Sequence, residues 1–168
     1  MMYIQDVFTK EECDLLIADL DGKSAPWRTN ERKEIKTVPI PESKVWFHER
    51  MKKLILRVNK VFEMEITGLT DPPTFVRYDQ ESFFDWHSDL YTGRAGLFRK
   101  FSIVTFLSRP GSYEGGEFQF FDHGIKPVIQ PQGSIVVFPA YMQHRVTKVT
   151  KGKRFSAVTF VGGETKYR

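Results

Sequence analysis

The sequence contains only one cysteine, Cys13, among its 168 residues. A single cysteine excludes an intrachain disulfide and offers no set of thiolates for a zinc site, and it favours a reducing compartment. No apolar run approaches the length of a membrane-spanning helix, and Met1 to Lys10 lack the basic and apolar regions of a secretory signal. We therefore expect a cytoplasmic protein without a membrane partner.

The chain also lacks internal repeats, low-complexity tracts and linkers, and it has only four histidines. Hydrophobic residues make up 40% and charged residues 27%, as in soluble globular proteins. We expect a single domain over 1–168, with helical support in 9–63 and a β core in 73–162. The net charge of +4 allows an acidic partner without requiring one.

Two helices are predicted before the β core. Thr9 and Glu12 have the spacing of a capping box, and the helix that they begin is expected to end at Gly22. A second helix, Ser43 to about Glu63, carries an apolar stripe that should lie against a sheet. The polar segment between them, Ala25 to Pro41, is interpreted either as a binding loop or lid, or as a solvated surface loop or edge hairpin.

From Pro73 onward, short apolar runs alternate with Gly, Pro and Asp, which predicts an all-β arrangement. Eight strands with tight turns fit a double-stranded β-helix, or jelly roll, so the expected fold class is mainly β with flanking N-terminal helices. The expected strands are Thr74–Tyr78, Phe83–His87, Phe101–Leu107, Glu117–Phe121, Lys126–Ile129, Ser134–Phe138, His144–Val149 and Arg154–Val161.

Three residues indicate metal chemistry. His87 and Asp89 are two positions apart, so they would share one face of a strand, and His144 follows Asp89 by 55 positions. Two imidazoles and one carboxylate suit Fe(II), and this facial triad leaves three octahedral positions open, as in non-haem Fe(II) oxygenases. We predict that His87, Asp89 and His144 are metal ligands and catalytic residues. His48 and His123 are interpreted as ordinary packed or surface histidines.

Arg154 stands ten positions after His144 and would share a strand face with Ser156. A guanidinium directed into an apolar barrel is costly unless an anion meets it, and a carboxylate is its natural bidentate partner. The pattern favours a carboxylate site made by Arg154 and the Ser156 hydroxyl. In the alternative, Arg154 points outward and joins the surface lysines Lys148, Lys151 and Lys153.

With these residues the chain resembles the Fe(II)- and 2-oxoglutarate-dependent dioxygenases, specifically the prolyl-4-hydroxylase-like group that includes the PKHD-type hydroxylases. The resemblance covers most of Pro73 to Gly162. The H-x-D and distal His of the family fall on the triad, its basic residue falls on Arg154, and Ser156 resembles the Ser of the Arg-X-Ser version. Further similar segments are Leu107–Pro110, Tyr113–Glu117 and His144–Gly152.

This resemblance implies Fe(II) as the metal, 2-oxoglutarate as cosubstrate and dioxygen as oxidant, with ascorbate as a supporting reductant. It implies that 2-oxoglutarate is converted to succinate and carbon dioxide while a substrate C–H bond is hydroxylated. The cosubstrate-binding tyrosine of the family matches Tyr78. A second tyrosine, present in several prolyl hydroxylases, falls near Phe106, so that hydroxyl contact is lost here.

The resemblance suggests a substrate that is a prolyl residue in a peptide or protein, or a related small molecule. Two basic segments, Ala25–Pro41 and Tyr91–Lys100, are candidate covering loops, and their charge would suit an acidic substrate. Trp86, Tyr91 and Arg77 stand close enough in sequence to the expected metal ligands to contact a substrate.

Two other functions stay open. A nucleic-acid-directed oxygenase of AlkB type uses the same triad, but its Arg-x-Asn-x-Thr-x-Arg pattern meets Ser156 and Phe160 at the Asn and second Arg positions, so no nucleic-acid partner is expected. A cupin-like, non-oxygenase jelly-roll metal-binding protein would have more histidines and gives Arg154 no role beside a metal.

Overall fold

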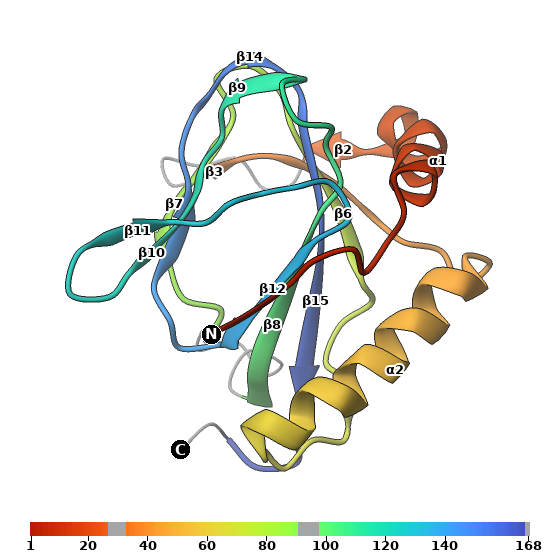
Figure 1. The fold of residues 1–168 in the computed structure, drawn as a ribbon, viewed down its shortest axis with the longest axis vertical. Helices are drawn as coiled ribbons and strands as arrows, with labels where there is room; N and C mark the ends of the chain where they lie inside the picture. Colours follow the sequence, from red (N-terminus) through yellow and green to blue (C-terminus); the bar gives the residue numbers. More distant parts are fainter. Residues whose placement is uncertain (27–32, 91–97, 167–168) are drawn as a thin grey trace.

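The computed structural model describes residues 1–26, 33–90 and 98–166. Two antiparallel sheets form a jelly roll, and two helices cover the outer side of the larger sheet (Figure 1). The larger sheet has the order β1-β12-β8-β15-β6-β4-β2, with β5 paired to β15, and the smaller one has the order β11-β10-β13-β7-β3. Strands β14 and β9 form a separate pair. The fold class expected from the sequence is confirmed.

The strands are β1 (Met2–Ile4), β2 (Ala25–Pro26), β3 (Lys33–Glu34), β4 (Lys36–Pro39), β5 (Gly68–Leu69), β6 (Thr74–Tyr78), β7 (Phe83–His87), β8 (Arg99–Phe106), β9 (Tyr113–Gly115), β10 (Phe118–Phe121), β11 (Ile125–Pro127), β12 (Ile135–Pro139), β13 (His144–Val146), β14 (Val149–Gly152) and β15 (Arg154–Gly162). The helices are α1 (Lys10–Leu20), the short 3-10 turn η1 (Asp21–Lys23) and α2 (Val45–Phe62).

The helix predictions hold to within a turn. Thr9 accepts a hydrogen bond from the Glu12 backbone and the Glu12 carboxylate accepts one from the Thr9 backbone, so the capping box is formed. Helix α1 ends at Leu20, two residues before the expected Gly22, because the chain tightens into η1. Helix α2 ends before Glu63, which takes a left-handed φ of 49°.

The predicted apolar stripe of α2 packs against the larger sheet. The Phe62 ring stacks on Phe101 of β8 with 5.5 Å between ring centres. Both helices and the larger sheet share one apolar cluster. Its buried residues include Cys13, Leu16, Leu20, Phe47, Met51, Leu54, Ile55, Val58, Phe75, Ile103 and Val137. The helices therefore close one side of the larger sheet and leave its other side to face the smaller sheet.

A second apolar cluster fills the space between the two sheets. Strand β8 is buried on both faces: Phe101 and Ile103 face the helices, while Val104 and Phe106 face the smaller sheet. The smaller sheet contributes Phe118, Phe120 and Val146 to the same interior. This interior, lined by inward residues of both sheets, includes Tyr78 and adjoins His144 and Arg154.

The segment Ala25–Pro41 is more regular than expected. Strand β4 extends the larger sheet by pairing with β6, and β3 pairs with β7 of the smaller sheet. Ile35, between them, is buried in the interior cluster. The described part of this segment therefore joins the edges of both sheets, closer to the edge-hairpin alternative, whereas residues 27–32 lie outside the described residues. The expected strand His144–Val149 is likewise divided, because β14 leaves β13 to pair with β9.

The second candidate covering loop is only partly described, since residues 91–97 lie outside the described residues. Two of the cations assigned to it, Arg99 and Lys100, begin β8 and are buried. Arg99 donates to Asp71 at 2.6 Å, and the ammonium of Lys100 lies 3.8 Å from a Glu65 oxygen. Interpreting these two residues as part of a basic surface loop was wrong. In the described part of the chain, no helix is long and apolar enough to cross a membrane.

Candidate active site

The smaller sheet brings the three predicted metal ligands together. His144 of β13 is the register partner of His87 at the end of β7, with 4.2 Å between the two ring centres. The potential ligand atoms of His87, Asp89 and His144 all lie within 4.8 Å of one another. Asp89 Oδ1 is 3.9 Å from His87 Nε2, and Asp89 Oδ2 is 3.8 Å from His144 Nε2. The three donors thus point at one common position.

Backbone carbonyls set the chemistry of both imidazoles. His87 Nδ1 lies 2.7 Å from the Asp85 carbonyl oxygen, and His144 Nδ1 lies 3.0 Å from that of Met142. Because a carbonyl only accepts, Nδ1 must carry the proton of each neutral ring, which leaves the Nε2 lone pair directed at the common position. Two neutral imidazole nitrogens and a carboxylate, without a thiolate, are a donor set that fits Fe(II).

Asp89 reaches this position differently from the prediction. Strand β7 ends at His87, so Asp89 lies in a bend and not on the strand. The Ala140 carbonyl accepts hydrogen bonds from the backbone N–H groups of Asp89 and Leu90, at 2.9 and 3.2 Å. These bonds to the end of β12, and not strand alternation, hold Asp89 beside the histidines.

The surroundings of the triad hold the carboxylate and bury Asp89 and His144. Ser102 of β8 donates its hydroxyl to Asp89 Oδ2, and both residues are buried. His144 is 4% exposed and lies 4.7 Å from the Phe138 ring centre and 5.4 Å from that of Phe118. The apolar walls lower the local dielectric, so charged ligands at this position would interact strongly.

Arg154 points inward, as favoured from the sequence. Its side chain, on β15, is only 1% exposed. The guanidinium donates from Nη1 to Ser156 Oγ at 3.3 Å, and from Nε and Nη2 to Gln130 Oε1 at 3.1 and 2.9 Å. No ion pair among the described residues includes Arg154, so its charge is met only by neutral groups there. A buried cation of this kind provides a strong site for an anion.

Aromatic rings connect Arg154 to the triad. The Arg154 guanidinium carbon lies 4.9 Å from the Tyr78 ring centre and 5.9 Å from that of Phe106. Phe106 contacts Phe118 at 6.0 Å, and Phe118 stacks with His144 at 5.4 Å. Burial raises the pKa of Tyr78 and outweighs the lowering effect of the Arg154 charge, so its phenol is neutral at physiological pH. Arg154, Ser156 and Tyr78 therefore line the same interior as the metal-binding candidates.

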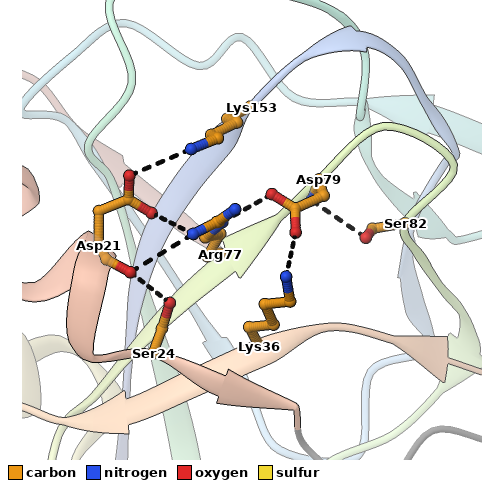
Figure 2. Close-up of polar contacts among 7 residues, drawn as sticks. All are labelled: Asp21, Ser24, Lys36, Arg77, Asp79, Ser82 and Lys153. Atoms are coloured by element: carbon orange, nitrogen blue, oxygen red, sulfur yellow. Dashed lines mark hydrogen bonds and ion pairs between the residues drawn. The ribbon is translucent and has the colours of Figure 1, made fainter.

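Two residues considered as substrate contacts lie elsewhere. Arg77 is on the opposite face of β6 from Tyr78, where it donates to Asp79 at 2.6 Å and pairs with Asp21 at 2.8 Å. Figure 2 shows these groups in one network with Lys36 and Lys153, outside the barrel interior. Because Lys153 and Arg77 adjoin Arg154 and Tyr78 in the chain, this network braces the strands that carry these two residues.

Trp86 also turns away from the triad. Its ring lies 4.6 Å from the Arg145 guanidinium carbon and 6.0 Å from the Phe121 ring, on the outer side of the smaller sheet. The prediction that it contacts a substrate beside the metal is therefore not supported by its position, and Tyr91 lies outside the described residues.

Sequence reasoning missed three contributors to this site. Ser102 was detectable, because it is a polar residue among the alternating apolar residues of β8. Gln130 sits in the connection before β12 and shows no periodic signal. Gly116 has a signal only as part of a segment similar to the family, yet a Cβ there would lie 2.9 Å from Arg154 Cδ, so the glycine leaves space for the arginine stem.

Comparison with known proteins identifies the family. The sequence model of the 2OG-Fe(II) oxygenase superfamily matches residues 73–162, more than half of the chain. The chain belongs to this superfamily. The match includes the three metal-binding candidates and Arg154, and members of this superfamily use Fe(II) and 2-oxoglutarate, which agrees with the donor set present.

Individual relatives agree with this assignment. A PKHD-type hydroxylase from Acinetobacter baumannii is 38% identical over 96 residues, which are 54% of this chain and 42% of that protein. The chain thus matches less than half the length of this curated relative. Among solved structures, a prolyl-4-hydroxylase from Pseudomonas putida superposes with a TM-score of 0.83 at 19% identity, covering 98% of this chain and 92% of that one. A prolyl hydroxylase from Trichoplax adhaerens, in complex with a hypoxia inducible factor peptide fragment, gives 0.83 at 14% identity, covering 97% and 83%.

Proposed function

We propose that this protein is an Fe(II)- and 2-oxoglutarate-dependent dioxygenase that hydroxylates a prolyl residue in a peptide or protein, or a related small molecule. One observation carries the proposal: the same apolar interior is lined by a converging His–Asp–His donor set and by a buried arginine. Among the residues that the structure describes, no acidic side chain pairs with this arginine. A metal site alone would suit many functions. The uncompensated arginine adds a requirement for an anionic ligand, which 2-oxoglutarate satisfies.

The roles of the residues follow from their positions. His87, Asp89 and His144 would hold Fe(II), with the imidazoles fixed by Asp85 and Met142 and the carboxylate fixed by Ser102. When bound together, iron, 2-oxoglutarate and dioxygen supply the oxidising power for cleavage of an unactivated C–H bond.

The cosubstrate contacts are assigned to the other end of the interior. Arg154 would bind the distal carboxylate of 2-oxoglutarate, Ser156 would add a hydroxyl donor, and Tyr78, which packs against the guanidinium, would complete the contacts. Phe106 presents an apolar ring beside Arg154, so it narrows the space without providing a hydrogen bond. The remaining phenyl rings between the sheets keep water from competing for these charges.

The substrate class rests on likeness to other proteins. The relatives are named PKHD-type hydroxylases, and the similar structures are described as prolyl hydroxylases, one of them with a bound peptide. These support a prolyl substrate in a peptide over a nucleic acid or a non-oxygenase role. The burial of Arg99 and Lys100 removes part of the argument for an acidic substrate.

The first test is an anaerobic visible absorption spectrum of the protein with Fe(II), before and after addition of 2-oxoglutarate. We expect a new charge-transfer band that requires both additions and is missing in Asp89→Ala. Circular dichroism would establish that the variant is folded. If the wild-type protein binds Fe(II) but gives no band with 2-oxoglutarate, the oxygenase proposal is wrong.

A second test addresses the substrate. Succinate release would be followed with prolyl-containing peptides and with free proline, in the presence of ascorbate to keep the iron reduced. Mass spectrometry should find one oxygen atom added to the proline ring of the accepted substrate. Succinate release that is not stimulated by any prolyl compound would exclude the prolyl specificity and leave the oxygenase assignment intact.

A further inference from the structure

Gln130 is placed to control the carboxylate site through Arg154. Its Oε1 accepts from Arg154 Nε at 3.1 Å and from Nη2 at 2.9 Å, so one oxygen engages an entire edge of the guanidinium. The amide orientation is chemically determined, because a guanidinium only donates and must face an oxygen. The other side of the amide, Nε2, donates to the Gly116 carbonyl oxygen at 3.4 Å.

The neutrality of the Gln130 amide matters as much as its shape. Arginine is ordinarily paired with a carboxylate when buried, since an unpaired buried charge is costly. Here the guanidinium is held by neutral groups, with the Gln130 amide along one edge and the Ser156 and Tyr78 hydroxyls as further side-chain partners, so the full positive charge is retained. A carboxylate at position 130 would make the same two hydrogen bonds but would neutralise Arg154 before any ligand arrives.

We propose that Gln130 is a positioning residue that orients Arg154 and, by staying neutral, makes the site select 2-oxo acids with a distal carboxylate. The inference rests on the proposed function, because it takes 2-oxoglutarate as the ligand of Arg154. With Gln130 neutral, the site requires a ligand with two carboxylates. With a negative charge at position 130, the site would tolerate a ligand whose far end is apolar.

The test compares two ligands of the same length. 2-Oxovalerate has the 2-oxo acid end of 2-oxoglutarate and a methyl group in place of the distal carboxylate, so the ratio of the two dissociation constants isolates the Arg154 end. Calorimetry with the Fe(II)-loaded protein under anaerobic conditions would give both constants. For the wild-type protein we expect 2-oxoglutarate to bind about 100-fold more tightly, which corresponds to about 2.8 kcal/mol.

Two variants separate charge from orientation. Gln130→Glu should reduce this preference by about tenfold or more, chiefly by weakening 2-oxoglutarate, while leaving the melting temperature of the ligand-free protein equal or higher because the arginine is now paired. Gln130→Met keeps the length but removes the acceptor, and it should also reduce the preference while lowering the melting temperature. A purely structural role would lower stability in both variants and leave the preference unchanged.

Gln119→Glu is the matched control, since Gln119 accepts from Arg145 Nε at 2.8 Å on the outer side of the smaller sheet. It should leave the ligand preference at the wild-type value. If wild type prefers 2-oxoglutarate and Gln130→Glu keeps that preference, the inference about Gln130 is overturned and the proposed function stands. If wild type itself shows no preference, the assignment of Arg154 in the proposed function fails.

Discussion

Tyr78 and Arg154 are register partners in the antiparallel pairing of β6 and β15, and the guanidinium carbon lies 4.9 Å from the ring centre. An aromatic face suits a guanidinium, which is weakly hydrated and always charged. Burial raises the pKa of the Tyr78 phenol, so the ring adds no negative charge. The pair thus presents a positive and otherwise apolar surface to the interior.

Replacing Arg154 should chiefly affect the cosubstrate. We expect Arg154→Ala to weaken 2-oxoglutarate binding by about 2–5 kcal/mol, as for the loss of one partner of a desolvated charge pair, without changing Fe(II) affinity. Calorimetry with each ligand separates the two effects. Arg145→Ala, which removes a guanidinium from the outer side of the smaller sheet, is the control. Unchanged 2-oxoglutarate affinity in Arg154→Ala would refute its assigned role.

Ser102 should tune the metal site through Asp89. Its hydroxyl donates to Asp89 Oδ2, and loss of such a supporting hydrogen bond typically lowers metal affinity by about 10–100-fold. We expect Ser102→Ala to show this loss in a competitive Fe(II) titration while remaining folded. Ser134→Ala removes a buried hydroxyl that bonds locally to the Pro131 carbonyl, and it should leave metal affinity unchanged. Equal effects of the two substitutions would mean that Ser102 contributes only to packing.

The parts of the molecule that follow from local chemistry could be predicted from the sequence. The capping box of Thr9, the stripe of α2 and the inward side of Arg154 depend on residue types at fixed short spacings. The convergence of His87 with His144 could be expected because the H-x-D and distal His of the similar family fall on these residues. Their role as iron ligands stays a prediction that the spectrum would test.

Other features depend on contacts distant in sequence, and these were not predictable. Strand β1 exists because Met2–Ile4 pair with the edge of β12, and three residues give no periodic signal. Gln130 reaches Arg154 only because the loop before β12 folds over β15. The spacing of Asp89 from His87 predicts a strand position, whereas the Ala140 carbonyl holds Asp89 in a bend.

The network in Figure 2 predicts a pH-dependent contribution to stability. Burial raises the pKa of Asp79, but hydrogen bonds from Lys36 and Arg77 outweigh this effect and lower the pKa below its ordinary 3.8. Since the folded pKa is lower than the unfolded one, Asp79 stabilises the fold above the unfolded value, and the contribution is lost as the pH falls through the folded value.

Asp79→Asn should therefore lower the melting temperature at neutral pH, and the difference from wild type should shrink at about pH 3. Thermal denaturation at both pH values measures this. Asp122→Asn removes a surface partner of Lys126 and should have little effect at either pH. A decrease for Asp79→Asn that is equal at both pH values would exclude the ion pairs as its cause.

Cys13 should be chemically inert in the folded protein. Burial raises the pKa of its thiol to about 12, with smaller upward contributions from Asp14 and Glu12. Because the thiolate is the reactive form, iodoacetamide should label the native protein very slowly at neutral pH and rapidly only in denaturant. Mass spectrometry would follow the labelling. Fast modification of the native protein would show that Cys13 is accessible and that its surroundings in α1 open readily.

Gly116 lies against the side chain of Arg154, at the end of the interior where we propose that the cosubstrate binds. Its φ is +60°, and an added Cβ would lie 2.9 Å from Arg154 Cδ and 3.0 Å from Val149 Cγ2. Gly116→Ala should cost about 1–2 kcal/mol in stability from the left-handed backbone alone. It should also weaken 2-oxoglutarate binding, because the arginine stem must move, while Fe(II) affinity is retained.

Gly22→Ala provides the comparison for Gly116→Ala, since no atom lies within 4 Å of the added Cβ and its φ is not in the left-handed region. It should change neither stability nor cosubstrate affinity appreciably, because η1 accepts a side chain there. Denaturation and calorimetry on both variants separate backbone strain from displacement of Arg154. If Gly116→Ala loses stability but binds 2-oxoglutarate normally, the glycine serves the turn alone, because the guanidinium can then reach its ligand despite the moved stem.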